Sequence, residues 1–385
     1  RKKADGKENE TEIDQENVND LIDYAIEKGV NYFDTSPAYC KGMSEEAVGK
    51  ALSRHPRDKY YIATKLSNFA TPSREDSMQM YKASFEKLKV DYIDYYLLHA
   101  LGDYEVFKER YVDNGMLEFL ISERKKGKIR NLGWSFHGKK EFFDYMMYDS
   151  GVDWDFTMIQ LNYFDWDNIQ GTSDVNSRYL YETLEKLKVP VMIMEPLLGG
   201  RLARPNHQAQ VLMKQSDPDA SYASWAFRFT ASLPEVLTVL SGMQFKEHLQ
   251  DSLHTFAPFK PLNNNERDML VNVANTMLKY KSITCTACNY CMPCAYGIDI
   301  PGVFSHYNRC IDEGNFPETP SSEFYKQARK AFLISLDRSV EKLRQANHCI
   351  GCGECLKKCP QRIRIPQEME KIDKFVENLR TDGLP

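Results

Sequence analysis

The first 255 residues of the chain alternate between short apolar runs and longer amphipathic stretches. Several of the runs are almost continuously apolar, which is typical of strands that are buried on both faces. We predict seven strands, at residues 31–35, 60–66, 92–100, 129–136, 156–164, 189–197 and 235–243. The stretches between them place their apolar residues on one helical face, as Val18, Leu21 and Ile22 do in the first of them.

This repeated order of strand and helix predicts βα units and a parallel sheet. The strands recur about every 30 to 45 residues, and a (β/α)8 barrel needs eight of them. Residues 1–14 are charged and contain no strand candidate, so we expect the first strand to lie upstream of Arg1. After the Pro- and Asn-rich stretch 256–266 the alternation stops. We therefore expect a barrel domain over residues 1–260 and an α-helical domain over residues 261–385.

Composition agrees with two domains and excludes some classes of protein. A chain of 385 residues is too long for one ordinary compact core. Its 42% hydrophobic and 27% charged residues are a globular composition. The net charge of −5 argues against a nucleic-acid partner, and no apolar run approaches the roughly 18 residues of a membrane span.

Eight of the ten cysteines stand in two short runs near the end of the chain. The first run consists of Cys285, Cys288, Cys291 and Cys294, and the second of Cys349, Cys352, Cys355 and Cys359. The second run continues into Pro360 and has the spacing that binds a [4Fe–4S] cluster. In the first run the last gap is one residue shorter, and Ala295 replaces the proline. We expect a helix before the first run, a helical stretch at about 320–346 between the runs, and a last helix at 366–380.

Structural zinc is the alternative ligand, because two CxxC pairs can together complete a four-thiolate zinc site. Two quadruplets, one of them ending in Cys-Pro, are more specific for iron–sulfur clusters, so we predict two [4Fe–4S] clusters. Thiols concentrated in this way indicate metal binding in a reducing compartment, and we expect a cytoplasmic protein. Outside the runs, we expect Cys310 to be a buried small residue and Cys40 to have a packing role or to line a pocket.

The helical domain resembles the α-helical ferredoxin modules of respiratory dehydrogenase subunits. By analogy with two-cluster ferredoxins, ligation crosses between the runs. One cluster is then bound by Cys285, Cys288, Cys291 and Cys359, and the other by Cys349, Cys352, Cys355 and Cys294.

Four polar residues stand at or just after predicted strand ends, where active sites of such barrels lie. They are Asp34, Tyr39, Lys65 and His99. Reduction of a carbonyl by hydride transfer needs a proton donor, and a tyrosine with an ordinary pKa of about 10 is a sluggish one. We expect the ammonium of Lys65 to lower the pKa of Tyr39, with Asp34 holding Lys65 in place. His99 then binds the carbonyl oxygen.

This set, with the segments "GKIRNLGWSF", "IQLNY", "EPLLGGRLA" and "VLSGM", resembles the aldo/keto reductase superfamily over residues 15–255. The whole chain is similar to the branch with a C-terminal ferredoxin-like extension. The resemblance implies a (β/α)8 TIM barrel that binds NADP or NAD and transfers hydride to or from a small carbonyl or alcohol, with the clusters for electron transfer.

The resemblance also implies cofactor-binding residues. Ser135 and Gln160 match residues that bind the nicotinamide carboxamide, and Asp251 and Ser252 stand where residues contact the adenine. Phosphate-binding positions are Leu197, Gly199, Arg201, Gly242, Met243 and Gln244. Three positions depart from the family, because Phe136 replaces an asparagine, Met194 a tyrosine, and Gln244 the arginine that grips the 2′-phosphate of NADP. Either Lys246 substitutes for that arginine or the preference for NADP is weak.

Other hypotheses stay open. Clusters carry single electrons, whereas nicotinamide carries hydride, and linking the two normally needs a flavin. A flavin-linked enzyme, or one fed by a ferredoxin- or flavodoxin-like carrier, is therefore a second hypothesis, and clusters that serve only as a structural or interaction module are a third. Trp134 and Trp166 line the pocket or the core. The basic side chains of Lys357, Lys358, Arg362 and Arg364 offset the cluster charge, dock an acidic carrier, or form a solvated face.

Overall fold

The computed structural model describes residues 3–4, 7–8, 12–169, 174–279, 282–317, 320–321, 323–361 and 363–381. Contacts divide the chain into two compact units. Unit 1 comprises Arg1–Leu161, Asp174–Pro196 and Thr230–Lys260, and unit 2 comprises Asn162–Ser173, Leu197–Phe229 and Pro261–Pro385. Unit 2 thus contains segments of the barrel sequence as well as the cysteine runs, and the expected domain division after residue 260 stays a prediction.

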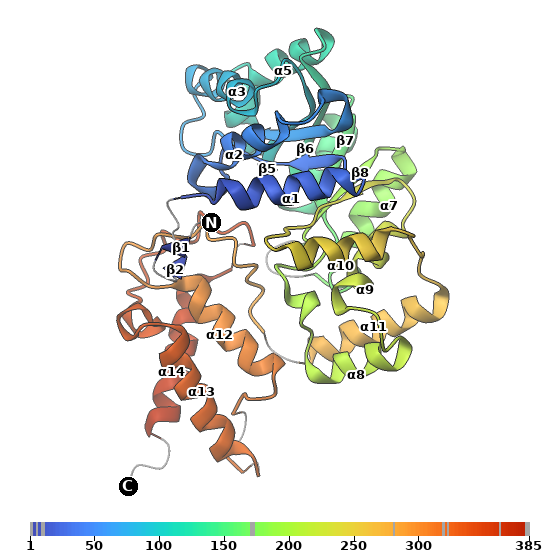
Figure 1. Cartoon of the computed structure of the whole chain (residues 1–385). Helices are drawn as coiled ribbons and strands as arrows, with labels where there is room; N and C mark the ends of the chain where they lie inside the picture. Colours follow the sequence, from blue (N-terminus) through green and yellow to red (C-terminus); the bar gives the residue numbers. More distant parts are fainter. Residues whose placement is uncertain are drawn as a thin grey trace. The chain divides into compact units, whose positions relative to one another are not determined.

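Unit 1 contains a parallel sheet whose strands follow one another in sequence order (Figure 1). The strands are β3 (Tyr32–Asp34), β4 (Tyr61–Leu66), β5 (Ile93–Leu101), β6 (Ile129–Phe136), β7 (Phe156–Gln160), β8 (Val191–Met194) and β9 (Val236–Val239). All seven predicted strands are present, and each pairs in parallel with the next. This is the arrangement of a nearly closed (β/α)8 barrel, so the fold prediction is confirmed.

Helices cover the outside of this sheet (Figure 1). They are α1 (Gln15–Glu27), α2 (Ser44–Leu52), α3 (Arg74–Leu88), α4 (Tyr104–Phe107), α5 (Met116–Lys125), α6 (Lys140–Asp144), α7 (Ser177–Leu187) and α10 (Lys246–Phe256). Ser73 caps α3, because its hydroxyl accepts a hydrogen bond from the main-chain N–H of Asp76 at 3.1 Å. The charged first residues form β1 (Lys3–Ala4) and its antiparallel partner β2 (Lys7–Glu8), so the statement that they hold no strand was wrong. A further strand upstream of Arg1 stays a prediction.

The barrel interior is filled with side chains. Ala63, Leu97, Phe156, Met158 and Met192, from four strands, form a buried cluster against which Tyr32, Tyr95, Met194 and Leu240 pack. An aromatic cluster joins β6 to α6. In it, Trp134 packs against Phe136, Phe142 and Phe143. Trp134 and Phe136 are both buried, so Trp134 is a core residue and not a pocket wall.

Unit 2 is helical. It contains α8 (His207–Ser216), most of α9 (Tyr222–Ala231), α11 (Asn264–Leu278), α12 (Ile300–Asp312), α13 (Tyr325–Ser339) and α14 (Ile365–Thr381). The last three share one apolar core that includes Phe304, Phe332 and Met369. The helix expected at 320–346 is the shorter α13, and α14 lies where a last helix was expected. Cys310 is buried in this core, as predicted.

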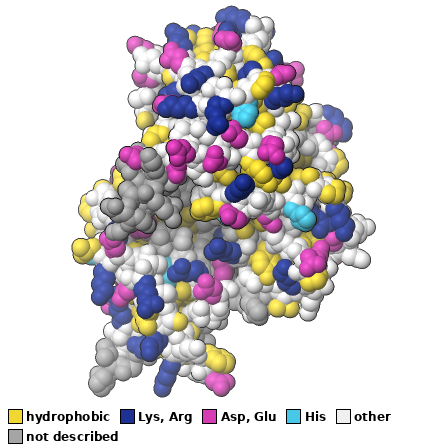
Figure 2. Space-filling model, viewed as in Figure 1, with side chains coloured by type: hydrophobic (Ala, Val, Ile, Leu, Met, Phe, Trp, Pro, Cys, Tyr) yellow, Lys and Arg dark blue, Asp and Glu magenta, His cyan; other side chains and the backbone are white. Residues whose placement is uncertain are grey.

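The surface carries both kinds of charge. Figure 2 shows basic and acidic side chains mixed over the visible face, in keeping with the small net charge. Among the helices of the described residues, none is long and apolar enough to cross a membrane.

Candidate active site and cysteine centres

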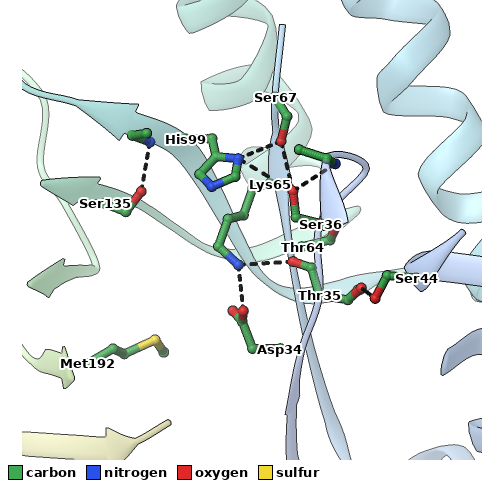
Figure 3. A network of polar contacts seen from close by, with 12 residues as sticks. Asp34, Thr35, Ser36, Ser44, Thr64, Lys65, Ser67, His99, Ser135 and Met192 are labelled. Carbon is green, nitrogen blue, oxygen red and sulfur yellow. Dashed lines mark hydrogen bonds and ion pairs between the residues drawn. The ribbon is translucent and has the colours of Figure 1, made fainter. Parts of the chain in front are cut away.

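A buried ion pair joins the ends of the first two strands of the parallel sheet. Lys65 in β4 donates from Nζ to Asp34 Oδ1 at 2.5 Å and to the carbonyl oxygen of Thr35 at 2.9 Å (Figure 3). The side chain of Lys65 is 1% exposed and that of Asp34 10%. Burial raises the pKa of Asp34, and the ammonium of Lys65 offsets part of this shift. The pair holds the Lys65 side chain in one orientation.

Tyr39 lies against this pair. It begins a short helical turn, η1 (Tyr39–Gly42), in which Cys40 and Lys41 have left-handed φ angles of 49° and 55°. The Lys65 Nζ lies 4.8 Å from the centre of the Tyr39 ring, and the His99 ring lies 5.9 Å from it. The four residues predicted to be catalytic therefore meet at one place, while their roles stay predictions.

The pKa of Tyr39 differs from the expectation. We expected Lys65 to lower it, but the pKa of Tyr39 is raised well above its ordinary value by burial, and then by the carboxylates of Asp34 and Glu195. The charge of Lys65 is matched by Asp34, which explains why the ammonium does not dominate. Tyr39 is therefore protonated near neutral pH and suited to donate a proton. Glu195, which follows β8, was not predicted as a site residue.

His99 is held by two serines that the sequence analysis did not single out. Its Nδ1 lies 2.5 Å from the hydroxyl oxygen of Ser67 and 3.4 Å from that of Ser36, and the two hydroxyls are 2.9 Å apart (Figure 3). The pKa of His99 is well below its ordinary value, first because of burial and then because of Lys65. The ring is therefore neutral, and Nε2 is the nitrogen left for a substrate oxygen. Both serines directly follow strand ends, which was the available signal.

The expected nicotinamide-binding residues lie in the same unit. Ser135 is buried in β6, and its hydroxyl accepts a hydrogen bond from the main-chain N–H of Ala100 at 2.8 Å (Figure 3). Gln160 ends β7, opposite Met194 of β8. Gly242, Met243 and Gln244 follow β9, and Asp251 and the buried Ser252 lie in α10. Roles in cofactor binding stay predictions for all of them.

The loop expected to bind phosphate with Leu197, Gly199 and Arg201 lies in unit 2. The main-chain N–H groups of Gly200, Arg201 and Leu202 donate within the loop itself, to the carbonyls of Leu197 and Leu198. The guanidinium of Arg201 donates to the hydroxyl of Ser282 at 2.5 Å. These main-chain donors and Nη2 of Arg201 are engaged, whereas Nε and Nη1 of Arg201 have no acceptor among the described residues, and phosphate binding by the loop stays a prediction.

The eight cysteines line two hollows in unit 2. The first hollow is lined by Cys285, Cys288, Cys291 and Cys359, and the second by Cys294, Cys349, Cys352 and Cys355, with Cys291 between them. The last cysteine of each run thus lies with the first three of the other. Electrostatics agrees, because the pKa of Cys291 is raised to about 12 by burial and then by Cys288, Cys285 and Cys359. In the same way, the thiols that raise the pKa of Cys355 include that of Cys294.

The distances between these thiols help to distinguish a zinc ion from a [4Fe–4S] cube as the bound group. Within the described ranges, no three His, Cys, Asp or Glu side chains lie close enough together to hold one metal ion. Structural zinc needs four ligands about 2.3 Å from a single ion. Four thiolates of a cube each bind a different iron and stand further apart. Each hollow offers the four thiols that a [4Fe–4S] cube requires, and the group that they hold stays a prediction.

The remaining candidates are Cys40, Trp166 and the basic residues near the second cysteine run. Cys40 is exposed, so the predicted packing role was wrong. Trp166 packs edge-on against Phe229 in unit 2. Lys357, Lys358 and Arg364 are exposed near the second run, and Arg362 lies outside the described residues.

Comparisons with known proteins cover both parts of the chain. The model of the aldo/keto reductase family matches residues 3–273, and that of the 4Fe-4S dicluster domain matches residues 284–364. The chain is 27% identical over 265 residues to the uncharacterized oxidoreductase YqkF of Bacillus subtilis, covering 60% of this chain and 80% of the relative. It is 25% identical over 289 residues to the NADH-specific methylglyoxal reductase of Escherichia coli, covering 63% and 83%.

Solved structures support the same fold. The aldo-keto reductase AKR11C1 from Bacillus halodurans, in its holo form, matches with a TM-score of 0.56 at 21% identity, over 69% of this chain and 89% of that one. The glycerol dehydrogenase AKR11B4 from Gluconobacter oxydans matches with a TM-score of 0.56 at 20% identity, over 70% and 89%. The family model spans more than half of the sequence, so this chain belongs to the aldo/keto reductase family and carries a C-terminal 4Fe-4S dicluster domain.

Proposed function

We propose that the protein is an NAD(P)(H)-dependent oxidoreductase that interconverts a small carbonyl compound and its alcohol, and that it carries two [4Fe–4S] clusters. The observation that carries the first part is the meeting of Asp34, Lys65, Tyr39 and His99 at the carboxyl ends of β3, β4 and β5. The name of one relative, the NADH-specific methylglyoxal reductase of Escherichia coli, also describes this reaction class.

Each of the four residues has a distinct task in this reaction. Bound NAD(P)H supplies a hydride to the carbonyl carbon. The phenol of Tyr39 gives its proton to the carbonyl oxygen, and its raised pKa keeps that proton in place until the oxygen becomes basic. The neutral His99, with Nδ1 held by Ser67, donates from Nε2 to the same oxygen. Lys65, fixed by Asp34, positions Tyr39 and stabilises the phenolate that remains.

Two polar side chains of unit 1 suit the nicotinamide end of the cofactor. Ser135 and Gln160 offer a hydroxyl and a primary amide, which complement a carboxamide. The phosphate end offers fewer partners, because Gln244 is uncharged and the main-chain N–H groups of residues 200–202 donate within their own loop. We therefore expect the enzyme to discriminate weakly between NADP and NAD.

The clusters supply one-electron chemistry, and each hollow has the thiols to hold one. We assign Cys285, Cys288, Cys291 and Cys359 to the first cluster, and Cys349, Cys352, Cys355 and Cys294 to the second. The side chains of Ile350 and Leu356 beside the second hollow are exposed, with exposed Lys357 and Lys358 next to them. An apolar patch with a basic rim suits an acidic carrier of the ferredoxin or flavodoxin kind.

One preparation tests both parts. Protein purified without oxygen should contain about eight irons per chain, as two cubes require, and should oxidise NADPH and NADH in the presence of small aldehydes. Iron near zero, or about four per chain, would reject the two clusters. Tight flavin binding without any nicotinamide binding would reject the hydride reaction.

A further inference from the structure

Three buried hydrogen-bond donors of unit 2 lack an acceptor among the described residues. They are Nε and Nη1 of Arg201 and the hydroxyl of Thr286, and none of them has a partner among the described residues. Thr286 follows the first cysteine of its run and lines the first hollow. We propose that Arg201 and Thr286 donate hydrogen bonds to the sulfur atoms of the first cluster and raise its reduction potential. This inference rests on the proposed function.

The loop that carries Arg201 is packed against the first cysteine run. A side chain on Gly199 would bring its Cβ within 2.5 Å of the Thr286 Cα, so only glycine allows this approach. Two residues later, Arg201 begins the turn η5 (Arg201–Ala203). Its guanidinium donates from Nη2 to Ser282 at 2.5 Å and lies 5.4 Å from the centre of the Phe164 ring. Both contacts fix the direction of the guanidinium fork.

The surroundings of Arg201 are negatively charged, and Cys285 contributes to them. Burial lowers the pKa of Arg201, and the charges of Asp312, Asp165, Tyr163 and Cys285 act in the opposite direction. The negative charge of Cys285, a predicted ligand of the first cluster, thus acts on the guanidinium after those of Asp312, Asp165 and Tyr163. A thiolate-ligated cluster adds further negative charge and sulfur acceptors at that position.

Unpaired donors are costly enough to require an explanation. A buried donor without a partner destabilises the folded state, and a charged donor does so more strongly. Arg228, a buried arginine of unit 2, shows the usual solution, because its Nη2 donates to both carboxylate oxygens of Glu266, at 2.7 and 2.8 Å. Arg201 has one acceptor, Ser282, for a fork of five N–H groups. Sulfur atoms of a cluster held in the first hollow would offer acceptors to Nε and Nη1.

Donors to a cluster favour its reduced form, because reduction adds negative charge to the sulfur atoms. A positive guanidinium acts in the same direction. The first cluster should therefore have a higher potential with Arg201 than without it. The second cluster has Cys294, Cys349, Cys352 and Cys355 as its ligands and should be unaffected.

The test is a redox titration followed by low-temperature EPR on the full-length protein. Arg201→Met should retain about eight irons per chain, and the equilibrium constant for reduction of the first cluster should fall at least tenfold, which is 59 mV for one electron. The signal of the first cluster is identified as the one that Cys288→Ser changes. Thr286→Val should lower the same potential by less, and Arg201→Lys should give an intermediate value.

Arg228→Met is the matched control, because it removes a buried arginine of the same unit that is paired with a carboxylate. Neither potential should change in it. Unchanged potentials in an iron-replete Arg201→Met protein would overturn the inference. Should Arg201→Met lose its iron, unchanged potentials in both Arg201→Lys and Thr286→Val would overturn it. Absence of iron from the parent protein would instead reject the proposed clusters.

Discussion

The polar groups of the barrel site and those of the cysteine hollows are satisfied to different degrees. In the barrel, Lys65 has both Asp34 and Thr35 as acceptors, and His99 is held by Ser67. Beside the first hollow, Arg201 and Thr286 have donors with no acceptor in the described chain. The barrel residues thus hold one another without a cofactor, although Oδ2 of Asp34 is buried and has no partner among the described residues. The cysteine region needs a bound group to complete it, and binding such a group contributes folding free energy.

The largest expected effect of this difference is on folding. Chelation of the iron should unfold much of the region from the first cysteine run to α14, because the thiols that line the hollows lose their common ligand. Limited proteolysis should then cut between residues 282 and 381, and circular dichroism should show a loss of helix. The barrel should stay protected and still bind a nicotinamide. If helices α12 to α14 remain protected from proteolysis after the iron is removed, the expected difference between the two regions is contradicted.

The second largest effect is on catalysis. Tyr39→Phe removes the proton donor and should reduce kcat for carbonyl reduction by roughly 10²- to 10⁴-fold. Nicotinamide affinity and iron content should match those of the parent, because the substitution removes only the phenol hydroxyl. The measurement is steady-state kinetics with an aldehyde that the parent reduces. Turnover close to that of the parent would remove Tyr39 from the mechanism.

A smaller effect concerns stability in unit 2. The carboxylate of Glu266 both caps α11, by accepting from the Asn263 N–H at 2.8 Å, and pairs with Arg228. Arg228→Met leaves this mostly buried carboxylate without its partner, and we expect a loss of about 3–5 kcal/mol. Thermal unfolding with iron bound measures it, with Lys374→Met, from an exposed ion pair, as the control. Equal unfolding temperatures for the two variants would contradict the expectation.

The smallest expected effect is on the pH dependence. The pKa of Tyr39 is raised, so its proton is present throughout the range from about pH 6 to pH 9. Carbonyl reduction should therefore keep a constant kcat over this range, and alcohol oxidation, which needs the phenolate, should speed up as the pH rises. Reduction that falls away above about pH 7 would mean that Lys65 lowers the pKa after all.

The sequence predicted the existence and order of the barrel strands better than the residues at which some of them end. Strand β6 was predicted with the bounds it has, because its apolar run ends where the strand ends. Strand β7 stops at Gln160, earlier than predicted, because the side chain of Asn162 accepts from the main-chain N–H groups of Phe164 and Asp165 and turns the chain. The pair β1–β2 escaped notice because two-residue strands carry no periodicity.

Site residues at strand ends could be predicted from the sequence. Contacts between site residues that are far apart in the sequence were harder to predict. Asp34, Lys65 and His99 could be placed from the strand order alone. The effect of Glu195 on the pKa of Tyr39 could not be predicted, because the two residues lie far apart in the sequence. Arg201 was assigned to phosphate by resemblance, whereas its contact with Ser282 depends on how the loop folds.

The central claim is that two clusters are held by crossed sets of cysteines, and EPR of four single variants tests it most directly. Cys288→Ser and Cys352→Ser mark the signals of the first and the second cluster. The account predicts that Cys359→Ser changes the signal marked by Cys288→Ser, and that Cys294→Ser changes the signal marked by Cys352→Ser. If Cys294→Ser instead changes the signal marked by Cys288→Ser, each run holds its own cluster and the account is contradicted.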